Sequence, residues 1–222
     1  METIFLLRHG ETAWNKQRRV MGRLEIPLNR KGISQANRIA RLLPNLEIHA
    51  IYSSPLKRAL DTAQILLEQN KIPMKIDPEL TEVDFGRWEG YLFDDLVEDE
   101  TYRRFLRSPQ KSAVPGGETI GDVQKRGLKA IQRAAREIPK GRLLFVSHGD
   151  VIRAVLCHYL RLPLEEFRRF SVDNGSLSVL EVDGSWAEIK FINYVPDITR
   201  MGKEPCEGHK PTLRRRNRSN TD

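Results

Sequence analysis

The stretch Thr3-Ile4-Phe5-Leu6-Leu7-Arg8-His9-Gly10 determines the fold that this sequence predicts. Its continuous apolar run is typical of a strand buried on both faces, and the polar residues after it mark the end of that strand. A second stretch, Leu143-Leu144-Phe145-Val146-Ser147-His148-Gly149, repeats the pattern. In both stretches the residue after the histidine is glycine, which permits a tight turn and a close approach of the backbone. Two buried strands are therefore expected, each ending in a histidine.

The segments between these stretches alternate between helical and extended patterns. Apolar residues spaced three and four apart predict helices over about 30–43, 55–68, 118–138 and 151–159. Ser54 is expected to cap the second of these, with Pro55 in its first turn. Shorter apolar runs predict strands at 50–52, 74–77, 177–182 and 186–192, the last two joined by a hairpin turn at Asp183-Gly184. Such alternation predicts an α/β three-layer sandwich, with a mostly parallel central sheet and helices on both faces.

Composition narrows the functional classes. The 222 residues are 39% hydrophobic and 30% charged, with two cysteines and a net charge of +7. These values exclude a membrane span, a disulfide-stapled scaffold and a collagen-like fibre, and they favour an enzyme or binding protein of the reducing cytoplasm. Nucleic acid is an unlikely partner, because residues 203–222 alone supply +3 of the charge. Residues 201–222 are expected to form a disordered basic tail.

The polar residues at the strand ends are the candidate site. The carboxyl ends of parallel strands meet at one edge of a sheet, which brings His9 and His148 together there. Arg58 follows the second strand and Glu82 follows the third. Arginines bind phosphate in a bidentate manner, so a phosphoryl group is the expected occupant of a site that holds Arg8 and Arg58. Two histidines and a glutamate also form a metal-ligand set, but the two arginines oppose a cation, and no metal is predicted.

Several motifs in this order resemble one family. Arg8-His9-Gly10-Glu11-Thr12 resembles the RHGET signature of the histidine phosphatase superfamily, which includes cofactor-dependent phosphoglycerate mutases. The similarity covers about residues 1–195, with Glu25 and Asn29 as small departures from the usual pattern. The further motifs that carry it are Asn15, Gly22, Pro27-Leu28, Gly32, Gln35-Ala36, Ser53 to Ala63, Glu79 to Glu82, Phe85 to Gly90 and Val146 to Gly149.

The resemblance implies a role for each site residue. His9 would attack phosphorus and become phosphohistidine, and Glu82 would be the general acid for the leaving alcohol and then the base for water. The transferring phosphoryl oxygens would be bound by Arg8, Asn15, Arg58 and His148. No cofactor is implied. Residues 1–200 would form the catalytic domain, with a cap-like insertion at about 86–117.

The same resemblance leaves two activities open. A phosphatase transfers the phosphoryl group to water, whereas a mutase returns it to a second hydroxyl. The interval from Glu82 to His148 is only 66 positions and contains Pro115-Gly116-Gly117, which is more similar to the phosphatase branch. We therefore expect a metal-independent phosphatase acting on a small phosphorylated metabolite. Phosphoserine, phosphoglycerates, sugar phosphates and α-ribazole phosphate remain open as substrates, and so does the oligomeric state.

A binding module that has lost catalysis is the alternative from a different functional class. The sequence retains the full set of charged and imidazole side chains that the reaction needs, which argues against this alternative: Arg8, His9, Arg58, Glu82 and His148.

Overall fold

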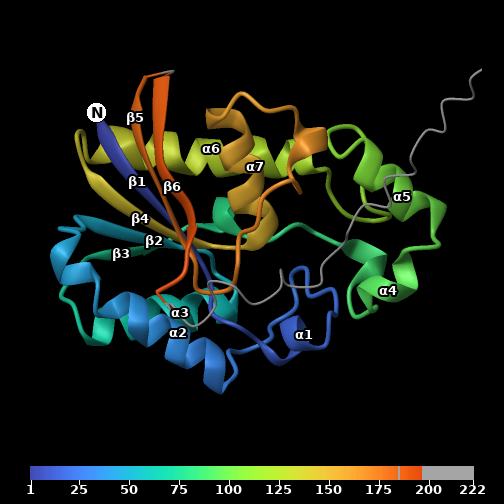
Figure 1. Ribbon diagram of the computed structural model, residues 1–222, viewed down its shortest axis with the longest axis horizontal. Helices are drawn as coiled ribbons and strands as arrows, with labels where there is room; N and C mark the ends of the chain where they lie inside the picture. The colour runs from blue at the N-terminus through green and yellow to red at the C-terminus, as the bar shows by residue number, and fades with distance from the viewer. Residues whose placement is uncertain (185, 197–222) are drawn as a thin grey trace, which may run out of the picture.

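A six-stranded sheet forms the centre of this computed structural model, which describes residues 1–184 and 186–196 (Figure 1). The strands in chain order are β1 (Glu2–Arg8), β2 (Ala50–Ser53), β3 (Met74–Ile76), β4 (Arg142–Ser147), β5 (Leu177–Asp183) and β6 (Trp186–Tyr194). Their order across the sheet is β3-β2-β4-β1-β5-β6. The first four are mutually parallel, and β5 and β6 add an antiparallel hairpin. The predicted mostly parallel sheet is confirmed.

Strand register brings the two histidine stretches level with each other. β1 and β4 are direct neighbours, and Arg8 pairs with Ser147 at the end of their ladder. His9 and His148 each come one residue later, so both leave the sheet at the same edge. Because a slip of one residue would exchange the buried faces of a strand, the packing of both faces fixes this register.

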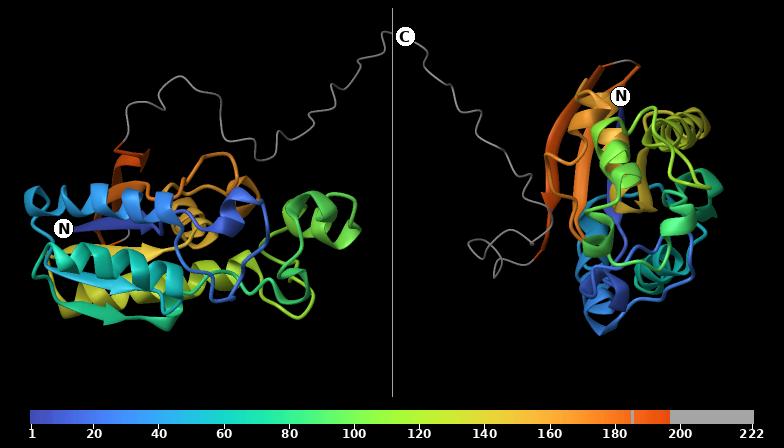
Figure 2. Two further views of the ribbon diagram at one scale, coloured as in Figure 1. Left: turned by 90° about the horizontal axis from the view of Figure 1, so that it is seen from below. Right: turned by 90° about the vertical axis from the view of Figure 1, so that its right-hand side faces the viewer.

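Helices cover both faces of the sheet (Figure 2). The α-helices are α1 (Ala13–Lys16), α2 (Arg30–Ala40), α3 (Lys57–Glu68), α4 (Phe93–Leu96), α5 (Glu100–Arg107), α6 (Ile120–Glu137) and α7 (Gly149–Tyr159). Short 3-10 turns occupy Leu43–Asn45, Pro78–Leu80, Gly86–Trp88 and Leu164–Glu166.

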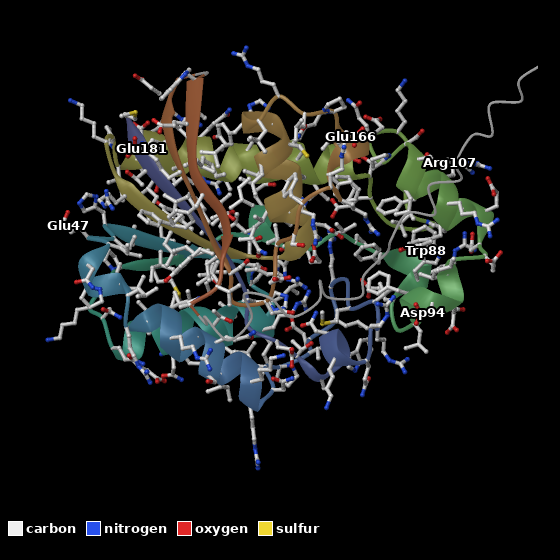
Figure 3. The ribbon with its side chains drawn as sticks, in the orientation of Figure 1. Glu47, Trp88, Asp94, Arg107, Glu166 and Glu181 are labelled. Atoms are coloured by element: carbon white, nitrogen blue, oxygen red, sulfur yellow. The ribbon has the colours of Figure 1, made fainter. Side chains whose placement is uncertain are left out.

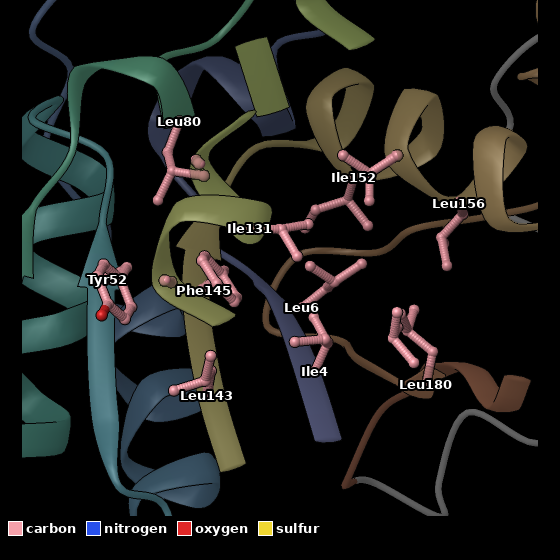
Figure 4. Close-up of a cluster of buried hydrophobic side chains, with 14 of the residues drawn as sticks. Ile4, Leu6, Tyr52, Leu80, Ile131, Leu143, Phe145, Ile152, Leu156 and Leu180 are labelled. Atoms are coloured by element: carbon pink, nitrogen blue, oxygen red, sulfur yellow. The ribbon is translucent and has the colours of Figure 1, made fainter. Parts of the chain in front are cut away.

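Successive side chains of a strand point to opposite faces of the sheet, and a different pair of helices packs against each face. Phe5 and Leu7 point into the cluster that holds Ile39 of α2 and Leu66 of α3. Ile4 and Leu6, together with Phe145, point into the opposite cluster with Ile131 of α6 and Ile152 of α7 (Figure 4). Each such side chain contributes roughly 1.5–3 kcal/mol by leaving water. The predicted three-layer sandwich is therefore confirmed.

A third apolar cluster lies in the segment between β3 and α6. Trp88 contacts both Tyr102 and Phe105 edge-on, with ring centroids 5.4 and 5.7 Å apart. The cluster continues into Val123 of α6 and Val151 of α7, so this segment is packed against the sandwich. Helices α4 and α5 extend beyond the sheet, as Trp88, Asp94 and Arg107 show in Figure 3. We call residues 86–117 the cap.

Several predicted boundaries differ from the structure by one to three residues, and three helix ends need correction with a physical reason. Helix α3 begins at Lys57, because Leu56 is still extended (φ −67°, ψ 136°) and Ser54 is not its cap. Helix α2 ends at Ala40 instead of Leu43. Helix α6 begins at Ile120, where Thr119 and Asp122 form a capping box. The predicted tail at 201–222 lies outside the described residues. Within the described part, no helix has the length and apolar character to span a membrane.

Candidate active site

The two histidines at the strand ends are neighbours in space. Their ring centroids are 5.2 Å apart with an angle of 58° between the ring planes. Both side chains are buried, His9 at 1% and His148 at 0% exposure. One phosphorus atom can therefore lie within reach of both rings, which is the geometry that the strand register predicts.

The ring of His9 is oriented by its own backbone. Nδ1 lies 2.7 Å from the carbonyl oxygen of Gly10. A carbonyl can only accept, so Nδ1 carries the hydrogen and Nε2 carries the free lone pair. Burial, followed by the charges of Arg58 and Arg8, holds the pKa of His9 well below its ordinary 6.5. The imidazole is therefore neutral near pH 7, with Nε2 available as a nucleophile.

The ring of His148 is held in the opposite tautomer. Its Nε2 lies 2.7 Å from the Ser54 hydroxyl, which also accepts the amide hydrogen of Leu56 at 3.3 Å. Among the described residues the hydroxyl has no other acceptor for its own hydrogen, so it donates to Nε2 and leaves the ring hydrogen on Nδ1. Burial and the charge of Arg58 lower the pKa of His148 well below 6.5, which keeps the ring neutral. Nδ1 is buried, has no partner among residues 1–184 and 186–196, and is available to donate.

Two guanidinium groups are anchored by backbone carbonyls. Arg58 donates from Nη1 to Leu24 O at 2.9 Å and from Nη2 to Gly22 O at 2.7 Å. Arg8 donates from Nη1 to Val172 O at 2.7 Å. In both arginines Nε is buried and has no hydrogen-bond partner within the described part of the chain. Burial lowers the pKa of Arg58 to about 10, so the group stays charged near neutrality.

Asn15 supplies an amide donor. Its Oδ1 accepts from the Thr12 amide at 3.0 Å and from Asn174 Nδ2 at 3.2 Å. The Thr12 hydroxyl also donates to this oxygen, at 3.0 Å, so the amide is fixed and its NH₂ group is left for a ligand. Asn174 also donates to the backbone oxygen of His9 at 3.2 Å, which ties Asn15 to the histidine turn.

Glu82 is the carboxyl group of the site. Its Oε1 accepts the Val83 amide at 3.0 Å. Burial and then the negative charge of Asp150 raise its pKa from 4.5 to about 7. The Val83 amide, Arg58 and Arg8 act in the opposite direction but do not cancel that effect. Near neutrality this carboxyl group can therefore give up a proton and take one back.

A cavity of about 400 Å³ opens beside these groups, and Arg8, Asn15, Arg58 and Glu82 all line it. Four of the six residues predicted from the sequence therefore share one cavity, whereas His9 and His148 are buried at the strand ends and are not among its lining residues. Within the described part of the chain, no group of three or more His, Cys, Asp or Glu side chains is placed to hold a metal ion.

Sequence reasoning missed four residues of this region: Ser54, Asp150, Arg168 and Asn174. Ser54 was interpreted as a helix cap, although its hydroxyl fixes the His148 ring. Asp150 follows the second histidine motif directly, so its position was a signal. Asn174 and Arg168 belong to the segment before β5, and only the pairing of β5 with β1 brings that segment to the site.

Comparisons with known proteins agree with this geometry. Residues 4–195 match the histidine phosphatase superfamily (branch 1), and the chain belongs to that family. It is therefore an enzyme of the histidine phosphatase superfamily. Phosphoserine phosphatase 1 of Hydrogenobacter thermophilus is 31% identical over 212 residues, covering 95% of this chain and 99% of that protein. Probable phosphoglycerate mutase GpmB of Salmonella choleraesuis is 34% identical, covering 83% and 87%. The solved structure of Bacillus stearothermophilus YhfR superposes with a TM-score of 0.80 at 33% identity, covering 86% and 96%.

Proposed function

We propose that this enzyme hydrolyses a small phosphorylated metabolite through a phosphohistidine on His9, without a metal ion. The observation that supports this proposal is a set of buried N–H groups without acceptors beside a histidine nitrogen with a free lone pair. Arg8 Nε, Arg58 Nε and His148 Nδ1 are buried and have no partners in the part of the chain that the structure describes, and His9 Nε2 carries a lone pair. Phosphoryl transfer needs mainly positioning and charge stabilisation, and a phosphoryl group supplies acceptor oxygens to these donors.

In the first step the lone pair of His9 Nε2 forms a bond to phosphorus while the ester P–O bond breaks. The leaving oxygen takes the proton of the Glu82 carboxyl group and departs as the alcohol. In the second step the Glu82 carboxylate removes a proton from water, whose oxygen bonds to phosphorus as the P–N bond breaks. Inorganic phosphate leaves, and both residues return to their starting forms. A carboxyl group with a pKa of about 7 is suited to both proton transfers.

The substrate site and its surroundings are part of the same proposal. Arg8, Asn15, Arg58 and His148 bind the phosphoryl oxygens, and the cap sets the substrate. Residues 1–200 act as one catalytic domain in this proposal. Placement in the cytoplasm is supported by the low cysteine content, with Cys157 a buried free thiol.

Phosphoglycerate mutase activity is the second candidate, because one of the curated relatives carries that name. The two are distinguished by a panel of phosphomonoesters assayed in EDTA, together with an assay for conversion of 3-phosphoglycerate to 2-phosphoglycerate. We expect phosphate release without isomerisation, and rapid-quench trapping of acid-labile phosphate on wild type but not on His9→Ala. Efficient interconversion would favour the mutase, and phosphate trapped on His9→Ala would overturn the assignment of the nucleophile.

A further inference from the structure

The cap side of the cavity holds an arginine that the proposed reaction does not use. Arg168 lines the cavity, as do Phe93 and Tyr102 of the cap helices. Its Nη1 donates to the Tyr102 hydroxyl at 3.4 Å, which places the guanidinium against the cap. The guanidinium carbon Cζ of Arg168 lies over the ring of Phe167, 5.2 Å from the ring centroid.

Arg168 differs from Arg18 and Arg153, which line the same cavity, in having no acidic partner among the described residues. Arg18 pairs with Asp94 at 2.8 Å and Arg153 pairs with Asp150 at 3.0 Å. Across the residues that the structure describes, no carboxylate lies within ion-pair distance of Arg168, and its Nε is buried without an acceptor. A buried guanidinium N–H without an acceptor is costly, and an anion that reaches it offsets that cost.

We propose that Arg168 binds a second anionic group of the substrate, and that the substrate class is therefore small phosphorylated carboxylic acids. This rests on the proposed function. The phosphoryl group is held at the strand ends by Arg8 and Arg58, and the carboxylate of the same molecule pairs with Arg168 at the cap. The rings of Phe93 and Tyr102 contact the carbon chain between the two charges. Arginine suits this role because its planar fork matches a carboxylate.

The test uses two esters that differ only in this group. In glycerol 3-phosphate a hydroxymethyl group replaces the carboxylate of 3-phosphoglycerate. We expect wild type to prefer 3-phosphoglycerate in kcat/KM by about tenfold or more, and Arg168→Gln to lose about 10- to 100-fold on that substrate, mainly through KM. On glycerol 3-phosphate the variant should stay within about twofold of wild type. Arg169→Gln is the matched control, since Arg169 is 75% exposed and paired with Glu166.

Each outcome has a distinct meaning. Equal losses on both esters would show that Arg168 is structural and would overturn the subsite. A wild type that hydrolyses both esters without preference would overturn it as well, while leaving phosphohistidine chemistry on His9 intact. If neither ester nor p-nitrophenyl phosphate is hydrolysed, the proposed function is wrong and the subsite falls with it.

A separate observation concerns the segment that carries Glu82. Arg126 of α6 donates from Nη1 to the carbonyls of Glu79, at 2.8 Å, and Thr81. Its Nη2 donates to the carbonyl of Glu82 itself at 3.2 Å. One guanidinium therefore holds three carbonyls in the four residues that end with the proposed general acid.

Glu118 completes this arrangement from the other side. Arg126 donates from Nη2 to Glu118 Oε1 at 2.7 Å and from Nε to Oε2 at 3.2 Å. The same Oε1 accepts the Asp84 amide at 2.9 Å. The backbone is thus fastened immediately before and after the general acid. The pair is largely buried, with side-chain exposures of 13% and 15%.

We infer that Arg126 is a positioning residue that aims Glu82 at the leaving oxygen. Lysine cannot reproduce the fork, so Arg126→Lys keeps the charge and loses the geometry. An alkyl ester needs the general acid, whereas p-nitrophenolate leaves without a proton. Arg126→Lys should lower kcat/KM for glycerol 3-phosphate about 10- to 100-fold and that for p-nitrophenyl phosphate less than about threefold. Lys125→Gln, at an exposed position of the same helix, should change neither. Parallel losses on both esters would overturn the inference.

Discussion

The ends of β1 and β4 have nearly the same sequence pattern and opposite hydrogen-bond chemistry. Each strand ends in a buried histidine followed by glycine, and the two rings are 5.2 Å apart. At the end of β1 a carbonyl accepts from Nδ1 of His9, which exposes a lone pair. At the end of β4 a hydroxyl occupies Nε2 of His148, which leaves a donor. The partner of each ring, and not the motif, therefore decides which histidine can attack and which can bind.

We expect the largest loss of activity from substitution of His9, the proposed nucleophile. His9→Ala removes the only proposed nucleophile, so we expect kcat to fall by about 10⁴-fold or more, with no phosphoenzyme in rapid-quench experiments. A retained circular dichroism spectrum and melting temperature would show that the fold survives. Substantial turnover by this variant would mean that the lone pair assigned to His9 does no chemistry.

We expect His148→Ala to lower kcat less than His9→Ala does. Removing one preorganised donor from a transition state costs about 10²- to 10³-fold in kcat. Because His9 is untouched, the phosphoenzyme should still form, at a reduced rate that single-turnover kinetics can measure. Equal losses in the two alanine variants would erase the distinction between nucleophile and donor.

The dependence on pH tests whether both rings are neutral. Burial and the nearby arginine charges depress the pKa of both histidines, so lowering the pH through 6.5 should not protonate them, and kcat/KM should show no acid limb from either ring. Glu82 must carry its proton in the first step, and its pKa is about 7. Activity on an alkyl phosphate should therefore fall above pH 7, about tenfold per unit. In Glu82→Gln this alkaline limb should vanish from the kcat/KM profile, and its persistence would assign the limb to another group.

The sequence predicts where the two strand ends lie but not the difference in hydrogen bonding between their histidines. The apolar runs place His9 and His148 at one sheet edge, because adjacent parallel strands end together. Arg58 and Glu82 are predicted at this edge for the same reason, and both side chains line the cavity. Their catalytic roles remain predictions. The tautomers were not predictable, since they depend on the Ser54 rotamer and on Leu56 being extended instead of helical. Arg168 and Asn174 were missed because their placement depends on the pairing of β5 with β1.

The glycine after each histidine gives a further contrast, in stability. A Cβ on Gly10 would lie 2.4 Å from the backbone oxygen of Gly32, which cannot move without shifting α2. A Cβ on Gly149 would meet side-chain nitrogens of Arg153 and Arg8 at 3.3 Å, and these can adjust. We expect Gly10→Ala to lower the free energy of unfolding by about 1–3 kcal/mol and Gly149→Ala by less than about 1 kcal/mol. Urea titrations of the two variants measure the difference, and the reverse order would contradict the packing argument.

The smallest effect should come from Ser54→Ala, which leaves both histidines in place and removes what distinguishes their tautomers. Without the hydroxyl, His148 Nε2 loses its donor and the ring is free to carry its hydrogen on either nitrogen. We expect kcat to fall about 5- to 10-fold, in line with the cost of one hydrogen bond, while His9 still forms phosphoenzyme. Ser54→Thr retains a hydroxyl and serves as the control for its hydrogen bond. The ¹⁵N chemical shifts of the His148 ring report the tautomer directly. Unchanged shifts in Ser54→Ala would show that something other than the hydroxyl orients His148, and the contrast between the two strand ends would then need another cause.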